Sequence, residues 1–360
     1  MSMAASKASN VLLAKCRAKF GRRLSEEDIT TLVNCRTVQE AAAYLKSNTR
    51  YASVLEGSDP AAMHRLNVEN ALKRMLFDEF SALCRYELSV GEWLSDYIIM
   101  SGEIKQIMSF LWLLSAGRPE EFLFTLPGFF MQHMDFDYAQ LSKCRSYTDF
   151  LQLMRSSRYS RVLRAFAPLD GEGVDCAAIE HALYDEFYKT VLGIIKQHYK
   201  GAARDELLDI IITQMDMRNF CHVYRMKKYY GAEPDTVRAM LLGNDSNVSQ
   251  RLRNEIINES DPDEVMRLFM ERSGYGRKLR LDISDVVGVE FAARRILFAK
   301  AVRMMRFSIH PASVLLSYII FAETEVQDIT TIVEAVHYKT PPEEILKLIT
   351  IDYLMEDTNK

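Results

Sequence analysis

Two short phrases recur three times along this chain at a nearly constant spacing. One phrase places an acid among apolar residues, and its copies are Val68-Glu69-Asn70-Ala71-Leu72, Ile179-Glu180-His181-Ala182-Leu183 and Val289-Glu290-Phe291-Ala292-Ala293. The other phrase ends in a tyrosine, and its copies end at Tyr51, Tyr159 and Tyr275. This period exceeds the roughly 20–50 residues of a solenoid unit, so it indicates modules the size of small domains. The sequence therefore predicts three related modules in one molecule.

The modules are expected to be helical. Apolar residues fall on one helix face in several stretches, for example at Ile104, Ile107 and Leu111, which is the spacing of an amphipathic helix. The 360 residues include only 15 Gly and 9 Pro, fewer than the turns of an all-β fold would require. We therefore predict an all-α fold.

Each predicted module combines a short helical segment, which ends at its tyrosine, with a long helical hairpin. The hairpins are expected near residues 66–130, 177–242 and 284–350. Within each hairpin a helix stops at Gly or Thr, and Pro followed by acids starts the next helix, at residues 117–121, 231–235 and 340–344. Proline has no N–H to leave unpaired in a first turn, and acids there favour the helix dipole. Boundaries near residues 132 and 247 give modules of residues 1–132, 133–247 and 248–360.

Composition limits the classes of partner. The net charge of −4 and the pI near 6.0 provide no general attraction to nucleic acid. The apolar stretches at residues 106–117 and 311–322 are shorter than the roughly 18 residues that span a bilayer, so they are predicted to be buried core helices. The N-terminus has no apolar stretch typical of a secretory signal, and the 6 Cys are spread singly, as expected of reduced thiols.

The sequence contains no motif for enzyme chemistry that we recognise. GxxxxGK[ST], GxGxxG, HExxH and GxSxG are all absent, and the 7 His do not have the spacing of metal ligands. A helical terpenoid synthase would need DDxxD and a second magnesium motif. Here Asp135 and Asp137 form only DxD, and Asn244 is followed at i+4 and i+8 by Val248 and Leu252. We therefore expect a non-catalytic chain with no cofactor and no metal.

Several phrases, taken in order, resemble one protein family. Residues 14–18 (AKCRA) and 24–28 (LSEED) resemble its AR-x-RA and LLS-x-EDY phrases. Residues 216–231 resemble its D-x-x-N-I … LR … G hairpin, and residues 318–345 resemble its closing segment. The family is the C subunit of the V-type and A-type rotary ATPases, whose eukaryotic homologue is the d subunit. Phe220 replaces the usual Ile, which indicates a divergent member.

The resemblance implies a funnel-shaped protein in which the three related helical modules have pseudo-threefold symmetry. It also implies a non-catalytic rotor adapter whose partners are the central-stalk subunits and the membrane rotor ring. Such an adapter couples ATP hydrolysis or synthesis to proton or sodium transport. Its expected location is cytoplasmic, peripheral to the membrane, with no transmembrane segment of its own and no nucleic-acid partner.

Polar residues on the predicted hairpins are candidates for a shared site. Asp216 and Asn219 are separated by three residues and could meet Arg225 or an equivalent group from a neighbouring module. Glu103 and Glu325 are assigned to the position of Asn219 in the other hairpins. Buried polar groups need partners. These side chains are therefore interpreted as a polar cluster between modules or, alternatively, as the lining of the funnel.

The repeat acids Glu69, Glu180 and Glu290 also allow two interpretations. Each lies near the start of a predicted long helix. They could make equivalent contacts with a partner, or they could be first-turn acids that the helix dipole favours.

Two series of basic residues support an alternative function. They are Arg155, Arg158, Arg161 and Arg164, and then Arg294, Arg295, Lys300, Arg303 and Arg306. A helical scaffold could bind protein or RNA partners through such basic faces, although solvated surfaces explain them as well. The scaffold hypothesis leaves the ordered match to one family, from residue 14 to residue 346, unexplained.

Overall fold

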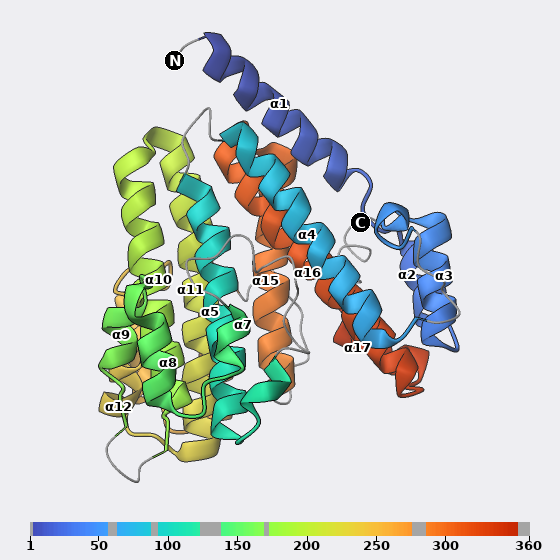
Figure 1. Cartoon of the computed structure of the whole chain (residues 1–360). Helices are drawn as coiled ribbons and strands as arrows, with labels where there is room; N and C mark the ends of the chain where they lie inside the picture. Colours follow the sequence, from blue (N-terminus) through green and yellow to red (C-terminus); the bar gives the residue numbers. More distant parts are fainter. Residues whose placement is uncertain are drawn as a thin grey trace. The chain divides into compact units, whose positions relative to one another are not determined.

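The computed structural model describes residues 3–56, 63–87, 93–122, 138–168, 173–275 and 286–351. These ranges contain helices and no β-strand (Figure 1), so the prediction of an all-α fold is confirmed. The chain divides into two compact units. The larger unit comprises Met1–Glu92 and Tyr199–Lys360, and the smaller unit comprises Trp93–His198.

A central helix, α16 (Pro311–His337), organises the larger unit. The long helices that pack against it are α1 (Met3–Phe20), α4 (Arg65–Glu87), α11 (Gly201–Tyr230) and α15 (Val286–Phe307). Every residue from Ser313 to Ala322 is buried, as expected of a helix that is apolar all round. The prediction that residues 311–322 form a buried core helix is therefore confirmed.

Short helices complete the larger unit. Along the chain they are α2 (Glu26–Val33), α3 (Val38–Asn48), η1 (Ala52–Val54), α12 (Pro234–Ala239), α13 (Gln250–Asn258), α14 (Pro262–Arg272) and α17 (Pro342–Leu348). Helices α2 and α3 pack against α16, and α14 packs against α11. The start of α2 is locally encoded, because the Ser25 hydroxyl accepts from the Asp28 N–H at 3.1 Å while the Asp28 carboxylate accepts from the Ser25 N–H at 2.7 Å.

The smaller unit is built on two long helices, α5 (Trp93–Ser115) and α10 (Cys176–His198), which pack together. Its short helices are η3 (Pro119–Glu121), α7 (Tyr138–Leu141), α8 (Tyr147–Leu153), η5 (Met154–Ser156) and α9 (Ser160–Arg164). The Phe110 ring lies 5.5 Å from that of Phe122 and 5.4 Å from that of Phe150. This aromatic contact joins the short segment to α5.

Three long helices end at a residue with left-handed backbone geometry. That residue is Gly117 after α5, Gly231 after α11 and Lys339 after α16, with φ of 72°, 52° and 58°. The prediction that Thr340 stops the last of these helices is wrong by one residue, since Lys339 adopts the positive φ. The predicted prolines at the following starts are confirmed, because Pro234 and Pro342 each open a helix.

The predicted modules are not the same as these compact units. The boundary near residue 132 lies outside the described residues, and the boundary near residue 247 lies in the loop between α12 and α13. Of the predicted hairpins, α15 and α16 pack together in the larger unit. The division into modules of residues 1–132, 133–247 and 248–360 stays a prediction about internal repetition.

Within the parts of the chain that the structure covers, no helix combines the length and the apolar character needed to cross a bilayer.

Candidate functional site

Each of the three repeated tyrosines donates a hydrogen bond from its hydroxyl to a carboxylate on a long helix. The pairs are Tyr51 with Glu325 on α16, Tyr159 with Glu103 on α5 at 2.7 Å, and Tyr275 with Asp216 on α11 at 2.8 Å. We call these three contacts the Tyr–acid junctions. They are the feature that the repeats share in the folded chain.

The junctions connect neighbouring repeats in a staggered order. The segment that ends at Tyr159 docks on α5, which precedes it, and the segment that ends at Tyr275 docks on α11, which also precedes it. The first segment has no long helix of this kind before it. Instead, Tyr51 reaches Glu325, 274 residues later in the chain. Each tyrosine therefore pairs with the long helix of the preceding repeat, and the first tyrosine pairs with the long helix of the last repeat.

The Glu325 junction is the most deeply buried of the three. The Glu325 side chain is fully buried, and it accepts from the Arg50 Nε at 3.0 Å and from the Leu24 N–H at 3.0 Å. Burial is the largest single influence on the pKa of Arg50 and lowers it, but Glu325, Tyr51, Tyr318 and Glu79 together outweigh burial, so the net pKa is raised. Burial and the same carboxylate hold the pKa of Tyr51 well above its usual value. A buried ion pair of this kind is tolerated because each partner satisfies the other.

A second carboxylate extends this junction. Arg50 also donates to the Tyr318 hydroxyl at 2.9 Å, and Tyr318 in turn donates to Glu79 on α4. Glu79 forms an ion pair with Lys19 on α1 at 2.7 Å. The network therefore joins helices α1, α4 and α16 to the segment that contains Arg50. Burial is the main reason that the pKa of Tyr318 is raised.

The Glu103 junction uses the same pair of residue types in the smaller unit. Glu103 is fully buried and Tyr159 is 1% exposed. The preceding residue, Arg158, lies with its Nε 3.8 Å from Glu103 and its Nη1 3.5 Å from Asp96. An Arg-Tyr dipeptide that meets a buried Glu thus occurs twice.

The Asp216 junction replaces the arginine with other donors. Gly274 precedes Tyr275, and Asp216 instead accepts from the Ser246 hydroxyl at 2.6 Å and from the Asn247 N–H at 2.9 Å. Burial raises the pKa of Asp216, while the hydrogen bonds from Ser246, Tyr275 and Asn247 act in the opposite direction. The charge of Arg253 also acts to lower the pKa of Asp216, and Lys300 on α15 pairs with Asp209 at 2.6 Å.

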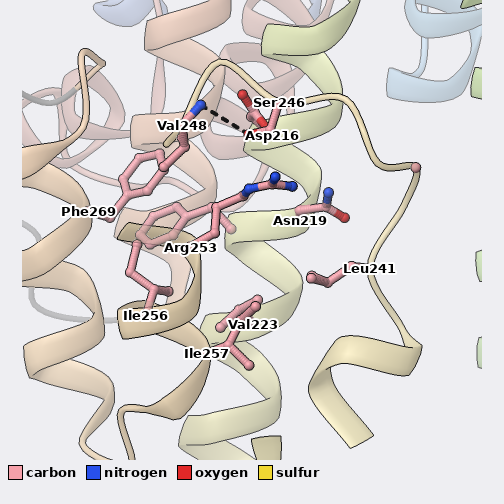
Figure 2. Close-up of a pocket in the computed structure, with 12 residues that line it drawn as sticks. Asp216, Asn219, Val223, Leu241, Ser246, Val248, Arg253, Ile256, Ile257 and Phe269 are labelled. Carbon is pink, nitrogen blue, oxygen red and sulfur yellow. Dashed lines mark hydrogen bonds between the residues drawn. The ribbon is translucent and has the colours of Figure 1, made fainter. Parts of the chain in front are cut away.

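A small cavity lies beside this junction. Figure 2 shows Asp216 and Ser246 at one end of it, and Val223 and Ile257 at the other. Its volume of about 50 Å³ leaves room for a few water molecules. The cavity is therefore a small local gap in the packing beside Asp216.

The predicted polar residues do not form a single cluster. Asn219 uses its side chain to bond the Leu242 N–H at 2.8 Å and the Leu242 carbonyl at 3.0 Å. Arg225 forms an ion pair with Glu290 on α15, and both side chains are partly exposed. Arg225 therefore meets neither Asp216 nor Asn219, and Asp216 instead meets Tyr275. By contact, the counterpart of Glu103 and Glu325 is Asp216 and not Asn219.

The repeat acids occupy equivalent positions in their helices. Glu69, Glu180 and Glu290 are each four residues beyond the start of α4, α10 and α15. None of them is in a first turn, so the interpretation as first-turn acids is wrong. Glu69 pairs with Lys73 on the same helix at 2.6 Å, and Glu180 is half-buried. Their contact with a partner stays a prediction.

Several side chains of the two basic series, residues 155–164 and 294–306, make contacts within the chain. Arg161 pairs with Glu186 at 3.2 Å, and Arg295 stacks 4.3 Å from the centre of the Phe291 ring. Lys300 and Arg158 belong to junctions described above. The two series therefore do not present uninterrupted basic faces.

One further buried acid was missed by the sequence reasoning. Asp328 on α16 accepts hydrogen bonds from the N–H groups of Thr350 and Ile351, both at 2.8 Å, and so fixes the chain after α17. Burial raises its pKa to about 7, although these two hydrogen bonds act to lower it. The available signal was an Asp on a largely apolar helix, three residues after Glu325. In the described ranges no group of His, Cys, Asp or Glu is arranged to hold a metal ion.

Comparison with known proteins places this architecture in a family. Residues 12–348 match the family model of the ATP synthase (C/AC39) subunit. The C subunit of the A-type ATP synthase of Pyrococcus horikoshii is 21% identical over 345 residues, which cover 93% of this chain and 88% of that protein. The proteins of the same name from Methanosphaera stadtmanae and Methanobrevibacter smithii are 24% and 26% identical, over 59% and 60% of this chain and 53% of each relative.

The fold and the Tyr–acid junctions define an all-α protein made of repeated helical segments. Because the family model spans nearly the whole chain, the chain belongs to the ATP synthase (C/AC39) subunit family. The resemblance to the C subunits of the V-type and A-type ATPases is thereby confirmed.

Proposed function

We propose that the protein is the non-catalytic central-stalk subunit of a V/A-type ATPase. In this role it connects the central stalk to the membrane rotor ring and couples ATP hydrolysis or synthesis to proton or sodium transport. The observation that carries the proposal is the family match over residues 12–348. The relatives, named as C subunits of A-type ATP synthases, support it, and one of them aligns over most of its length.

The buried junctions fit a part that transmits torque. Torque passes through a rigid body without loss, and densely packed helical interiors are barely compressible. The Glu325 junction ties the N-terminal segment that ends at Tyr51 to α16 through buried charges. We propose that the three modules form a pseudo-threefold funnel, that its opening receives the stalk, and that the Tyr–acid junctions keep it stiff.

The proposed partners are the rotor ring and the central-stalk subunits, at the cytoplasmic face of the membrane. Glu69, Glu180 and Glu290 are proposed to face these partners because they recur at one helix position. Both Glu69 and Glu290 are paired within the chain, so we expect each to contribute modestly.

Affinity purification tests this function directly. A tagged chain is recovered from its native membranes in mild detergent, and the co-purifying proteins are identified and counted by mass spectrometry. We expect the catalytic head, the central stalk and the ring, with one copy of this chain per complex. Recovery of the chain without any of these subunits would contradict the proposal.

Loss of the protein provides a second test. In a deletion strain, ATP hydrolysis is expected to continue in the catalytic head while ion pumping by its membranes is lost. Restoring the gene should restore pumping. Coupled pumping in the deletion strain would refute the coupling role. Binding of RNA that weakens steeply with salt would instead support the scaffold alternative.

A further inference from the structure

A second cavity opens in the larger unit, where the starts of α3 and α4 meet the end of α16. Its volume is about 400 Å³, which lies in the range of small-molecule sites. The polar residues around it are Arg36, Thr37, Gln39, His64, Arg65, His337 and Lys339. No junction described above uses this cavity.

Positive charge in this cavity is only partly neutralised. Of its basic side chains, Arg65 forms an ion pair with Glu334. Glu40 directs its carboxylate to the backbone N–H of Arg36, at 2.8 Å. In the described part of the chain, no hydrogen bond or ion pair engages the charged groups of Arg36 and Lys339. The cavity therefore favours a negatively charged occupant.

The backbone adds hydrogen-bond donors to the same cavity. Helix α3 begins at Val38 after the cap Thr37, whose hydroxyl accepts from the Glu40 N–H at 3.1 Å. The N–H groups of Val38 and Gln39 come before that bond and have no acceptor among the described residues. Both residues line the cavity. Free first-turn amides and a positive helix dipole bind anions well.

Lys339 has a left-handed backbone conformation, which is unusual for a residue other than glycine. The two other long helices that end with a positive φ carry Gly117 and Gly231 there, whereas Lys339 has φ of 58° with a full side chain. A side chain in the left-handed region costs conformational energy, which glycine avoids. Such a cost is typical of positions that have a function. Here it places a cation at the cavity.

We propose that this cavity binds a small phosphate-bearing anion. Arg36 and Lys339 neutralise its charge, and the first amides of α3 donate hydrogen bonds to its oxygens. The phosphate belongs either to a free anion or to the headgroup of an anionic lipid, which offer the same oxygens. The inference does not depend on the proposed role in an ATPase.

Titration of the full chain tests this site with two probes. Inorganic pyrophosphate is added in a calorimeter, and vesicles of phosphatidylcholine with or without phosphatidic acid are tested by flotation. We expect saturable binding of at least one phosphate probe, which weakens with added salt. Lys339→Gly and Arg36→Gln should each weaken it about tenfold, the loss of one charge-assisted contact. Arg303→Gln, which removes an exposed cation outside the cavity, should leave it unchanged.

Lys339→Gly separates binding from folding. Glycine is better suited to this backbone, so the variant should unfold at the same or a higher temperature than the parent chain. Binding of pyrophosphate alone would assign a free anion, and binding of phosphatidic acid vesicles alone would assign a headgroup. The absence of saturable binding to both probes overturns the proposal. So does binding that Lys339→Gly and Arg36→Gln retain in full.

Discussion

Tyr51 donates the hydrogen bond from its hydroxyl to Glu325, which lies 274 residues later in the chain. Both side chains are fully buried, and the Arg50 guanidinium is held at the same carboxylate. The contact joins the N-terminal segment to the central helix of the larger unit. It is therefore a sensitive point at which to test what stabilises that unit.

Replacing Tyr51 by Phe removes this hydrogen bond and keeps the ring. We expect the free energy of unfolding, measured by urea denaturation, to fall by about 1–3 kcal/mol, because a buried carboxylate loses one of its donors. Tyr338→Phe is the matched control, since Tyr338 is 68% exposed. Equal stabilities of the two variants would show that the Tyr51 hydroxyl contributes nothing.

Glu325→Gln is expected to cost more, because it leaves the Arg50 charge buried beside a neutral amide. Breaking a buried ion pair from one side typically costs about 3–5 kcal/mol. Glu334→Gln breaks a partly exposed pair with Arg65, so its cost should stay below about 1 kcal/mol. Chemical denaturation of both variants gives the comparison. A smaller loss for Glu325→Gln than for Glu334→Gln would contradict this assignment.

Asp328 should make stability depend on pH. Its pKa rises from an ordinary 3.8 to about 7 on folding, so between these values the folded chain keeps a proton that the unfolded chain releases. The stabilisation is complete below pH 3.8 and is lost as the pH rises to about 7. Asp328→Asn lacks this proton and should gain stability relative to the parent chain across that window. The exposed control Asp235→Asn should change stability with pH in parallel with the parent chain. A profile of Asp328→Asn that also runs parallel to that of the parent chain would contradict the pKa shift.

Alanine substitutions at Gly243 and Gly193 should have opposite effects on stability. Gly243 has φ of 58°, and a Cβ there would lie 2.8 Å from the Met215 Sδ, whereas a Cβ on Gly193 in α10 meets nothing within 4 Å. Gly243→Ala should therefore lower the melting temperature. Gly193→Ala should raise stability by roughly 0.5–1 kcal/mol, the helix preference of Ala over Gly. A Gly243→Ala variant as stable as the parent chain would show that the loop adapts.

The helices could be predicted from the sequence because their causes are local. Apolar spacing, capping residues and the prolines at Pro234 and Pro342 act within a few residues of each other. The acids Glu103 and Glu325 could likewise be selected, as polar residues on apolar helices. Their tyrosine partners could not, because each comes from another repeat and only the folded chain brings them together.

The assignment of Asn219 shows why spacing alone is insufficient. Glu103 and Glu325 lie at the same separation from the left-handed residue that follows their helix. Counted back along the sequence from Gly231, Asp216 lies slightly beyond this separation, and Asn219 falls slightly short of it. The two residues thus compete for one role, and the position of the Tyr275 hydroxyl decides it. Lys339 was missed for a similar reason, since Thr340 follows it and resembles an ordinary stop.

The attachment of the first segment to α16 also affects how the protein is made. A ribosome that adds about 5–20 residues per second needs roughly 15 to 55 s to reach Glu325 after Tyr51 has been synthesised. During that time the nascent N-terminal helices expose the apolar faces that α16 later covers. The N-terminal helices therefore cannot bury these faces against α16 until the C-terminal part of the chain has been synthesised. Chaperones can bind the exposed faces during this interval.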